Sequence, residues 1–351
     1  MSFPTVLPAA RPTGPVPALR WGIMGTGWIA DKFTRSVKAH TNQIIAAVGS
    51  RERSKAVEFA EGLGIAKSHG SYEDLLYDKE IDVIYVATPH NYHHPHTLLA
   101  LNAGKHVLVE KPAALNRAQA AEMVDLASRK NLFFAEALWT YFLPKFDVIE
   151  QLLQSEVLGE ILSVYTEYGE YLPPEHRLFD PKLAGGPLLD LGTYPVSFLT
   201  KLLGVPDKVT GIGQVHESGV VGQLAVVMAN AKGNLGTMAT SPFGFSPTNA
   251  VVLGTHASLW FDTEFLLPGS FTLRSQDGSH ILAFTEPRTA HLDGLHHEAT
   301  EVARAIASNQ TETPKRTPQS SLDTLQTLDL ICEAVGIDFS EASRGNNNRF
   351  G

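Results

Sequence analysis

The stretch RWGIMGTGWIA, residues 20–30, decides the fold of this 351-residue chain. It begins with a short apolar run, which predicts a strand, and passes directly into a glycine-rich turn. After the turn, Ile29, Phe33 and Val37 recur with the period of a helix that has one apolar face. A strand, a glycine turn and a helix in this order are the local context that a dinucleotide-binding fingerprint requires.

The turn reads GTGWIA over residues 25–30, the G-x-G-x-x-A form of that fingerprint. Gly25 permits a tight turn and Gly27 lets the backbone approach a pyrophosphate, while Ala30 keeps the helix close to the sheet. The free N–H groups at the start of the helix favour an anion. We therefore predict that the turn binds a dinucleotide. The residues expected to contact it are Gly25, Thr26, Gly27, Trp28 and Ile29.

Strand and helix signals alternate up to about residue 136. The runs IIAAVGS, IDVIYVAT and HVLVE are apolar and contain many β-branched residues, as expected of parallel strands covered on both faces. Helical stretches such as SKAVEFAEGLG and NRAQAAEMVDLASRKN separate them. This alternation predicts a doubly wound parallel sheet, a Rossmann domain over residues 19–140.

The pattern changes after about Pro144, where strand-like runs dominate and short turns bearing Gly, Asn, Asp or Lys separate them. Connections of that length make antiparallel pairs. We expect an α+β domain over residues 141–340, built on a large, mostly antiparallel open sheet. Helices near residues 146–157, 186–203 and 296–308 should cover one of its faces. The other face is a candidate surface for a homodimer or a dimer of dimers.

Composition limits the location and partners of the chain. Residues 1–18 hold five prolines and predict a flexible or extended arm, and residues 341–351 predict a disordered tail. The formal net charge of -9, without any cluster of Lys and Arg, argues against nucleic acid as a partner. No apolar run approaches the roughly 20 residues that span a membrane. The single cysteine, Cys332, excludes an internal disulfide and fits a reducing compartment such as the cytoplasm. We expect the partner of the chain to be a small molecule.

The end of the second predicted strand bears on the choice of cofactor. A fold that binds NAD usually ends this strand with Asp or Glu, which holds the ribose 2′-hydroxyl. Here the strand ends with Ser50 and Arg51, and no carboxylate is present there to repel a 2′-phosphate. Ser50 can donate to that phosphate, and Arg51 can pair with it while stacking on adenine. These residues favour NADP over NAD, although a solvated arginine would fit the same position.

A lysine stands at the carboxyl end of a later strand, in the sequence Val-Glu-Lys-Pro over residues 109–112. Ligands of doubly wound folds bind in the crevice beyond these strand ends. Lys111 could donate to a substrate oxygen there or lower the pKa of a neighbouring acid. The residue before a proline is held extended, which would aim Lys111 outward. The residues alone leave open whether it is functional or an ordinary surface lysine.

A further candidate lies in AGGPLLDLGTYPVSF, residues 184–198. Pro187 suits the first position of a helix, and Asp190 and Tyr194 are four apart, so on one helix they share a face. A carboxylate and a phenol on an otherwise apolar segment are costly to bury. Asp190 and Tyr194 therefore indicate a functional site, although a tyrosine of the core beside an incidental aspartate is an alternative.

Taken together, GTGWIA, VEKP, GGPLLDLGTYPV and GLHHEATEVARAI resemble the glucose-fructose oxidoreductase, inositol dehydrogenase and rhizopine-catabolism (Gfo/Idh/MocA) family from about residue 19 to 338. The resemblance implies that Lys111, Asp190 and Tyr194 face the nicotinamide. Tyr194, where many members have histidine, and EALWT at 136–140 are most similar to the dimeric dihydrodiol dehydrogenase and NADP-dependent D-xylose dehydrogenase branch. Tyr141 stands where those relatives usually have arginine, which leaves the substrate open.

The resemblance also places the histidine-rich loop of residues 90–96 beside the nicotinamide. Pro95 interrupts the histidine spacing and no acidic or thiol partner adjoins it, so we expect no metal site. Further residues expected at the cofactor are Thr88, Pro89, His90, His93, Glu110 and Lys111. Residues expected at the substrate are Lys111, Trp139, Tyr168 and Tyr194.

These features predict an oxidoreductase that transfers hydride between NADP and a hydroxyl-bearing carbon of a sugar, cyclic polyol or dihydrodiol. We assign Tyr194 as the general acid/base, because a nearby ammonium favours phenolate. Lys111 would be its electrostatic partner and a donor to the substrate oxygen, and Asp190 would orient them. Lys111 could instead be the base. The same fold also allows a nicotinamide-dependent glycosidase or a cofactor-sensing regulator without catalysis.

Overall fold

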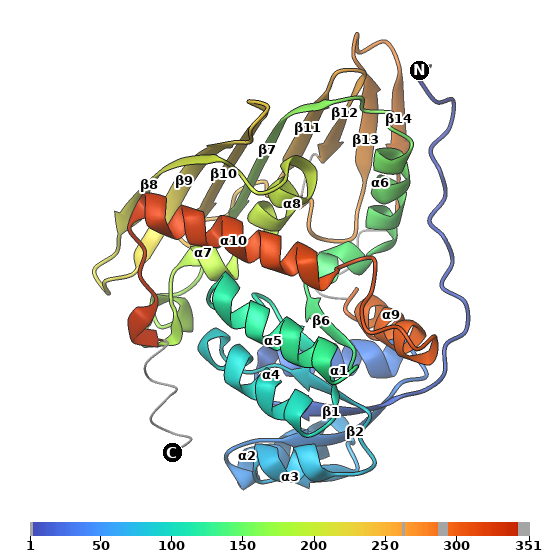
Figure 1. Ribbon diagram of the computed structural model, residues 1–351, viewed down its shortest axis with the longest axis vertical. Coiled ribbons are helices and arrows are strands. Elements are labelled where there is room, and N and C mark those ends of the chain that lie inside the picture. Colours follow the sequence, from blue (N-terminus) through green and yellow to red (C-terminus); the bar gives the residue numbers. More distant parts are fainter. Residues whose placement is uncertain (1–2, 262–263, 287–293, 343–351) are drawn as a thin grey trace. The chain divides into compact units, whose positions relative to one another are not determined.

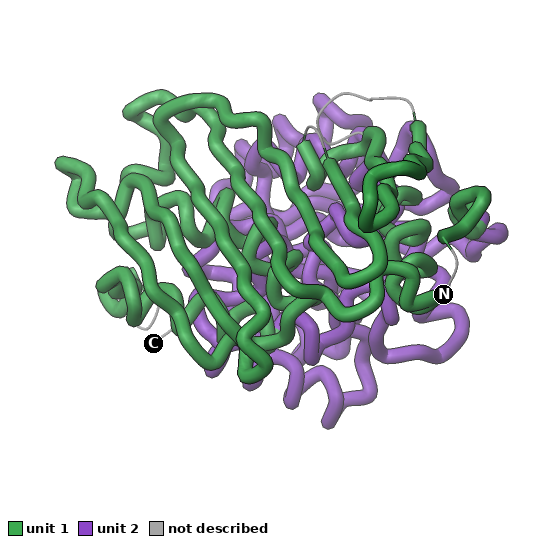
Figure 2. The backbone as a smooth tube through the Cα atoms, turned by 90° about the horizontal axis from the view of Figure 1, so that it is seen from above, with its two compact units in different colours: residues 1–11, 143–289, 322–351 green, residues 12–142, 290–321 purple. Residues whose placement is uncertain are grey.

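The computed structural model describes residues 3–261, 264–286 and 294–342. The chain divides into two units, each assembled from separate stretches of sequence (Figure 2). The parallel-sheet unit, purple in Figure 2, comprises residues 12–142 and 290–321. The antiparallel-sheet unit, green, comprises residues 1–11, 143–289 and 322–351.

The parallel-sheet unit is built on six strands in the order β3-β2-β1-β4-β5-β6, all parallel. Figure 1 labels β1, β2 and β6 of this sheet. The strands are β1 Arg20–Met24, β2 Ile44–Gly49, β3 Lys67–His69, β4 Val83–Val86, β5 His106–Glu110 and β6 Phe134–Ala137. The connecting helices are α1 Trp28–His40, α2 Arg53–Leu63, α3 Tyr72–Tyr77, α4 His93–Asn102 and α5 Arg117–Arg129. β4 is buried at every position, as expected when helices cover both faces. The predicted doubly wound sheet is confirmed, and its strand order reverses between β1 and β4, where such sheets bind ligands.

One helix of this unit arrives from far along the chain. α9, His296–Ala307, packs against α1, and the backbone N–H of His296 donates to Ser36 Oγ at 3.2 Å. The sequence assigned this helix to a face of the antiparallel sheet, and that assignment is wrong. The stripe that α9 buries, which includes Ala299 and Val302, is covered within the parallel-sheet unit.

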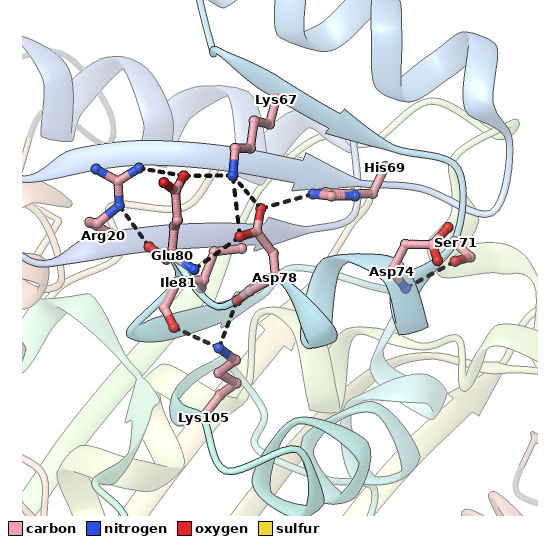
Figure 3. A network of polar contacts seen from close by, with 9 residues as sticks. All are labelled: Arg20, Lys67, His69, Ser71, Asp74, Asp78, Glu80, Ile81 and Lys105. Atoms are coloured by element: carbon pink, nitrogen blue, oxygen red, sulfur yellow. Dashed lines mark hydrogen bonds and ion pairs between the residues drawn. The ribbon is translucent and has the colours of Figure 1, made fainter.

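The edge strand β3 is held by a network of charged side chains (Figure 3). Lys67 Nζ lies 2.9 Å from an oxygen of Asp78 and 2.6 Å from one of Glu80. His69 reaches Asp78 at 3.3 Å, and Arg20 on β1 reaches Glu80 at 3.1 Å. These contacts tie the edge strand to the loop that follows α3.

The antiparallel-sheet unit is built on eight strands in the order β14-β13-β12-β11-β7-β10-β9-β8. Only the pairing of β7 with β10 is parallel, so the predicted, mostly antiparallel sheet is confirmed. β13 and β14 were not predicted. The strands are β7 Ile161–Gly169, β8 Lys208–Val215, β9 Val221–Ala229, β10 Leu235–Ser241, β11 Ala250–Gly254, β12 Ala257–Phe261, β13 Phe271–Ser275 and β14 Ile281–Phe284.

One face of this sheet is covered by helices. α8 (Thr193–Leu203) packs on β7 and β10, and Thr200 Oγ1 donates to Thr327 Oγ1 of α10 at 3.0 Å. The ring of Phe146 on α6 lies 6.1 Å from that of Phe198 on α8. The other helices of the unit are α6 Pro144–Gln154, α7 Pro187–Asp190 and α10 Pro318–Val335, whose first turn belongs to the parallel-sheet unit.

The opposite face of the sheet is solvent-exposed and carries large apolar side chains. Val227, Thr237, Tyr165, Val251 and Trp260 are paired in turn across five neighbouring strands. Val227 is 52% exposed and Tyr165 is 45% exposed. Exposed apolar side chains in a continuous row are typical of a surface that binds a partner.

The N-terminal arm contacts the antiparallel-sheet unit through residues 3–11. The guanidinium of Arg11 pairs with Asp147 on α6 at 2.6 Å, and Gln151 donates to the carbonyl oxygen of Ala9 at 2.9 Å. Of the predicted disordered tail, residues 341–351, the part from residue 343 onward lies outside the described residues, whereas residues 341–342 are helical and Ala342 is buried, so the prediction is wrong there. Within the described residues, no helix combines the length and apolar character needed to cross a membrane.

Candidate active site

The glycine turn joins β1 to α1 in the geometry that the fingerprint requires. Gly25 has a φ of 111°, and a Cβ on it would lie 2.5 Å from the carbonyl oxygen of Ala87, so only glycine fits there. Gly27 is the N-cap of α1, and among the described residues no atom lies within 4 Å of where its Cβ would be. Gly27 and Trp28 are exposed, so the start of α1 is open to an anion such as the pyrophosphate of a dinucleotide.

The end of β2 places an arginine among aromatic rings. Ser50 is buried, whereas Arg51 is exposed and its guanidinium carbon lies 5.5 Å from the centre of the Tyr92 ring. Burial raises the pKa of the Tyr72 phenol, and the charge of Arg51 and a hydrogen bond from it oppose that shift. Sequence reasoning found Ser50 and Arg51 but not the two tyrosines, which come from α3 and from the short 3₁₀ helix of residues 90–92 and belong to no motif.

Two further loops leave the sheet beside this turn, at the carboxyl ends of β4 and β5. Thr88 and His90 are buried, and Pro89 caps the short 3₁₀ helix η1, His90–Tyr92. The phenol of Tyr85, on β4, donates to one oxygen of the Glu110 carboxylate at the end of β5. The backbone N–H of Lys111 donates to the other at 3.0 Å. The Lys111–Pro112 peptide bond is cis.

A buried ion pair supports the segment that follows Pro112. Glu136 on β6 accepts a hydrogen bond from the backbone N–H of Ala113 at 2.9 Å. The same carboxylate accepts from the guanidinium of Arg316 at 2.6 Å and from Ser321 Oγ at 2.7 Å. Glu136 and Arg316 are 1% and 3% exposed. Trp139, a predicted substrate residue on the 3₁₀ helix η2 (Trp139–Phe142), is 2% exposed.

The remaining predicted residues lie in the antiparallel-sheet unit. Asp190 and Tyr194 do not share one continuous helix: α7 ends at Asp190 and α8 begins at Thr193. Pro195 explains the break, because it has no N–H to donate to the carbonyl of Leu191. The argument that a single helix aligns the two side chains is therefore wrong.

The partners of Asp190 and Tyr194 were also not apparent from the sequence. Arg177 pairs with the Asp190 carboxylate at 3.0 Å. The ring of Tyr194, which is 7% exposed, meets that of Tyr168 edge-on at 5.9 Å. The phenol of Tyr168 donates to Glu170 at 2.8 Å, and its pKa is raised well above its usual value, chiefly by burial.

The histidine-rich loop uses its rings in contacts within the parallel-sheet unit. His94 contacts Glu122 at 2.8 Å, and the ring of His96 stacks on that of Tyr92 at 5.4 Å. Burial, and then the charges of His93 and Arg51, lower the pKa of His96 to about 3. Among the described residues, no group of three His, Cys, Asp or Glu side chains could hold a metal ion.

Two family models match the chain. Residues 19–137 match the NAD-binding Rossmann fold of an oxidoreductase family, and residues 146–260 match the GFO/IDH/MocA C-terminal domain. Trans-1,2-dihydrobenzene-1,2-diol dehydrogenase from Mus musculus is 33% identical over 93% of this chain and 100% of that protein. The chain belongs to the Gfo/Idh/MocA family. The predicted resemblance and the predicted nicotinamide-dependent oxidoreductase are both confirmed.

Another relative and two solved structures are also similar to this chain. The dihydrodiol dehydrogenase of Bos taurus is 34% identical over 92% of this chain and 99% of its own length. Among solved structures, KijD10, a 3-ketoreductase from Actinomadura kijaniata in complex with NADP and TDP-benzene, has a TM-score of 0.79 at 24% identity, covering 91% and 98% of the two chains. A levoglucosan dehydrogenase in complex with NADH and levoglucosan has a TM-score of 0.81 at 18% identity, with the same coverage. These two likenesses establish the shared fold.

Proposed function

We propose that the protein is an NADP-dependent dehydrogenase that oxidises a CH–OH group of a sugar, cyclic polyol or trans-dihydrodiol. The family and the dihydrodiol dehydrogenase relatives support this class of substrate. Bound NADP would accept or return the hydride, and the residues of the chain would bind the substrate and move its hydroxyl proton. Initial rates with aldoses, inositols and trans-dihydrodiols, each with NADP and with NAD, test the proposal. Absence of cofactor reduction with every member of the panel would contradict it.

The choice of NADP rests on the end of β2. Ser50 and Arg51 would offer a hydroxyl and a guanidinium to a 2′-phosphate, and β2, which ends at Gly49, contains no carboxylate. The ring of Tyr92 holds the guanidinium from one side, which reduces the ordering cost of binding. Relatives on this fold have been solved with either cofactor, so the fold alone does not choose between them.

Replacing Arg51→Ala tests this choice directly. Loss of a charge-assisted hydrogen bond should raise KM for NADP by about 10- to 100-fold. KM for NAD should change little, because NAD has no 2′-phosphate. Lys55→Ala, an exposed cation on the neighbouring helix, is the matched control and should leave both constants unchanged. Equal effects of Arg51→Ala on the two cofactors would contradict the proposed role.

We further propose that the two units have different roles in catalysis. The parallel-sheet unit binds the dinucleotide and provides Lys111, and the antiparallel-sheet unit binds the substrate and provides Tyr194. Tyr194 would exchange the hydroxyl proton, and Lys111 would favour the phenolate and donate to the substrate oxygen. Asp190 would act through its ion pair with Arg177, a partner that the sequence did not indicate.

Lys111→Met and Tyr194→Phe should each lower kcat by about 10²- to 10⁴-fold. Tyr77→Phe is a suitable control, because Tyr77 is 77% exposed on α3. If both active-site variants fold and keep near-normal turnover, the catalytic assignment is wrong. Should only Tyr194→Phe stay active, Lys111 would be the base.

We also propose that the exposed face of the antiparallel sheet forms a homodimer in the cytoplasm. The row of paired side chains that includes Val227 and Tyr165 supplies the apolar area for such an interface. Light scattering after size exclusion should give twice the chain mass, and Val227→Glu should give the monomer. A wild-type monomer at micromolar concentration would contradict this proposal.

A further inference from the structure

His93 connects the two loops that follow β4 and β5. It is fully buried at the start of α4. Its Nδ1 lies 2.7 Å from the carbonyl oxygen of Pro112, and its Nε2 lies 2.7 Å from the carbonyl oxygen of Thr88. One imidazole ring therefore bridges the carboxyl ends of two neighbouring parallel strands.

Each nitrogen of this ring faces a backbone carbonyl oxygen, and a carbonyl oxygen only accepts hydrogen bonds. A neutral imidazole has one N–H group and one nitrogen lone pair, so it would direct its lone pair at one of the two oxygens. A ring turned over would place carbon atoms at these positions, and C–H···O contacts are longer, at about 3.3–3.6 Å. Two contacts of 2.7 Å are satisfied together only when both nitrogens carry a proton.

We infer that His93 is a buried imidazolium that fixes the Lys111–Pro112 segment to the loop after β4, and that it is a positioning residue for Lys111. This role rests on the proposed function of Lys111. The segment is held by side chains of three elements. Glu110 of β5 holds the N–H of Lys111, His93 of α4 holds the carbonyl of Pro112, and Glu136 of β6 holds the N–H of Ala113.

Two other histidine rings lie near His93. The His90 ring lies 5.6 Å away, centre to centre, and His96 contacts Thr88 Oγ1 at 3.0 Å from the next turn of α4. The pKa of His96 is lowered to about 3, first by burial and then by the charges of His93 and Arg51, so His96 stays neutral. On the strand side, the Glu110 carboxylate supplies negative charge to the same backbone segment as Pro112.

The protonation state is measured by NMR on the full-length protein with ¹⁵N-labelled histidine. One ring should retain two protonated nitrogens up to pH 8, well above the value of about 6.5 at which a free histidine titrates. That signal should disappear in His93→Gln and remain in His94→Gln. If every histidine is neutral at pH 8, the inference is wrong. This readout does not depend on activity.

Turnover measures the positioning role. His93→Gln should lower kcat by about 10- to 100-fold, because a small displacement of a reacting group is costly. KM for NADP should change by less than about threefold, because the His93 ring is fully buried and both its nitrogens face backbone carbonyl oxygens, in place of the cofactor contact that the sequence predicted. His94→Gln, on the adjacent residue with its ring against the exposed Glu122, should leave both constants unchanged. Wild-type kcat in His93→Gln would refute the positioning role. If Lys111→Met stays active while the doubly protonated ring is observed, the proposed catalysis fails but the charge of His93 stands.

Discussion

Two regions of the parallel-sheet unit each bury a glutamate, and the two carboxyl groups differ in their hydrogen-bond partners. Glu136 on β6 is 1% exposed and its carboxylate accepts hydrogen bonds from Ala113, Arg316 and Ser321. Glu298 on α9 is 0% exposed, and among the described residues neither of its carboxyl oxygens has a hydrogen-bond partner. Burial, and then the charge of Glu110, raise the pKa of Glu298 well above its usual value.

The difference shows that burial alone does not determine whether a carboxylic acid is protonated. A buried charge is tolerated when donors replace the water that it lost, and otherwise the group takes up a proton. Glu136 therefore acts as an ionised anchor for the segment after Pro112. Glu298 acts as a neutral filler of the interior beside Glu110. The following changes test this contrast, from the largest expected effect to the smallest.

Glu136→Gln should have the largest effect, a loss of about 3–5 kcal/mol in the free energy of unfolding, because it leaves the Arg316 guanidinium buried without its counter-charge. Urea unfolding at pH 7 measures this loss. Glu298→Gln is the matched control on the same unit. Equal losses in the two variants would remove the contrast between the regions.

Lys145 gives an intermediate case in the antiparallel-sheet unit: its side chain is buried, and its Nζ donates to the carbonyl oxygen of Leu267 and lies over the rings of Phe146 and Phe261. Burial lowers its pKa to about 7, against a smaller opposing effect of Glu286. A folded-state pKa below the unfolded value means that wild-type stability rises with pH between about 7 and 10.5. Relative to wild type, Lys145→Met should lose about 3 kcal/mol of stability between pH 7 and pH 10. A pH-independent difference in urea unfolding would refute this prediction.

Glu298→Gln should change the free energy of unfolding by less than about 1 kcal/mol at pH 5, because an amide of similar volume replaces a neutral acid. The raised pKa of Glu298 means that wild type loses stability as pH rises above the unfolded value toward the folded one. The variant lacks this loss, so its stability relative to wild type should increase from pH 5 to pH 8. A constant difference over this range would indicate an ionised Glu298.

Lys67→Met should have the smallest effect, because Lys67 and Glu80, two members of the network at the edge of β3 (Figure 3), are 39% and 55% exposed. Its urea midpoint should move less than in the other variants, and the shift should vanish at about 1 M salt. Backbone and Lys67 contacts lower the pKa of Asp78 against its burial, and Lys67 lowers that of Glu80. The network therefore stabilises above about pH 4.5 and weakens as pH falls. Lys79→Met is the control, and an equal shift there would assign the effect to net charge.

The fold was largely predictable because its signals are local. The apolar run before Gly25 and the helical spacing after it specify a strand and a helix without reference to the rest of the chain. The missed strands β13 and β14 are only five and four residues long, so each carries a weak alternating pattern. α9 was assigned to the wrong unit because its apolar face shows that it packs against something and does not show against what.

The site was predictable only as a set of separate residues. Ser50, Arg51 and Lys111 stand at strand ends, where the topology of a doubly wound sheet places ligands. Their partners could not be found in this way, because Tyr92, Glu136 and Arg177 lie far along the chain from the residues that they support.

By itself, the sequence determined the Rossmann sheet, the dinucleotide turn and the family, because each depends on residues close together in the chain. The tertiary structure decided the state of each buried polar group. Packing brings hydrogen-bond donors to the Glu136 carboxylate, and among the described residues it brings none to Glu298. It also places both nitrogens of His93 against carbonyl oxygens. The physical reason is that the charge of a buried side chain depends on the partners that packing brings to it, and those partners come from elements distant in sequence.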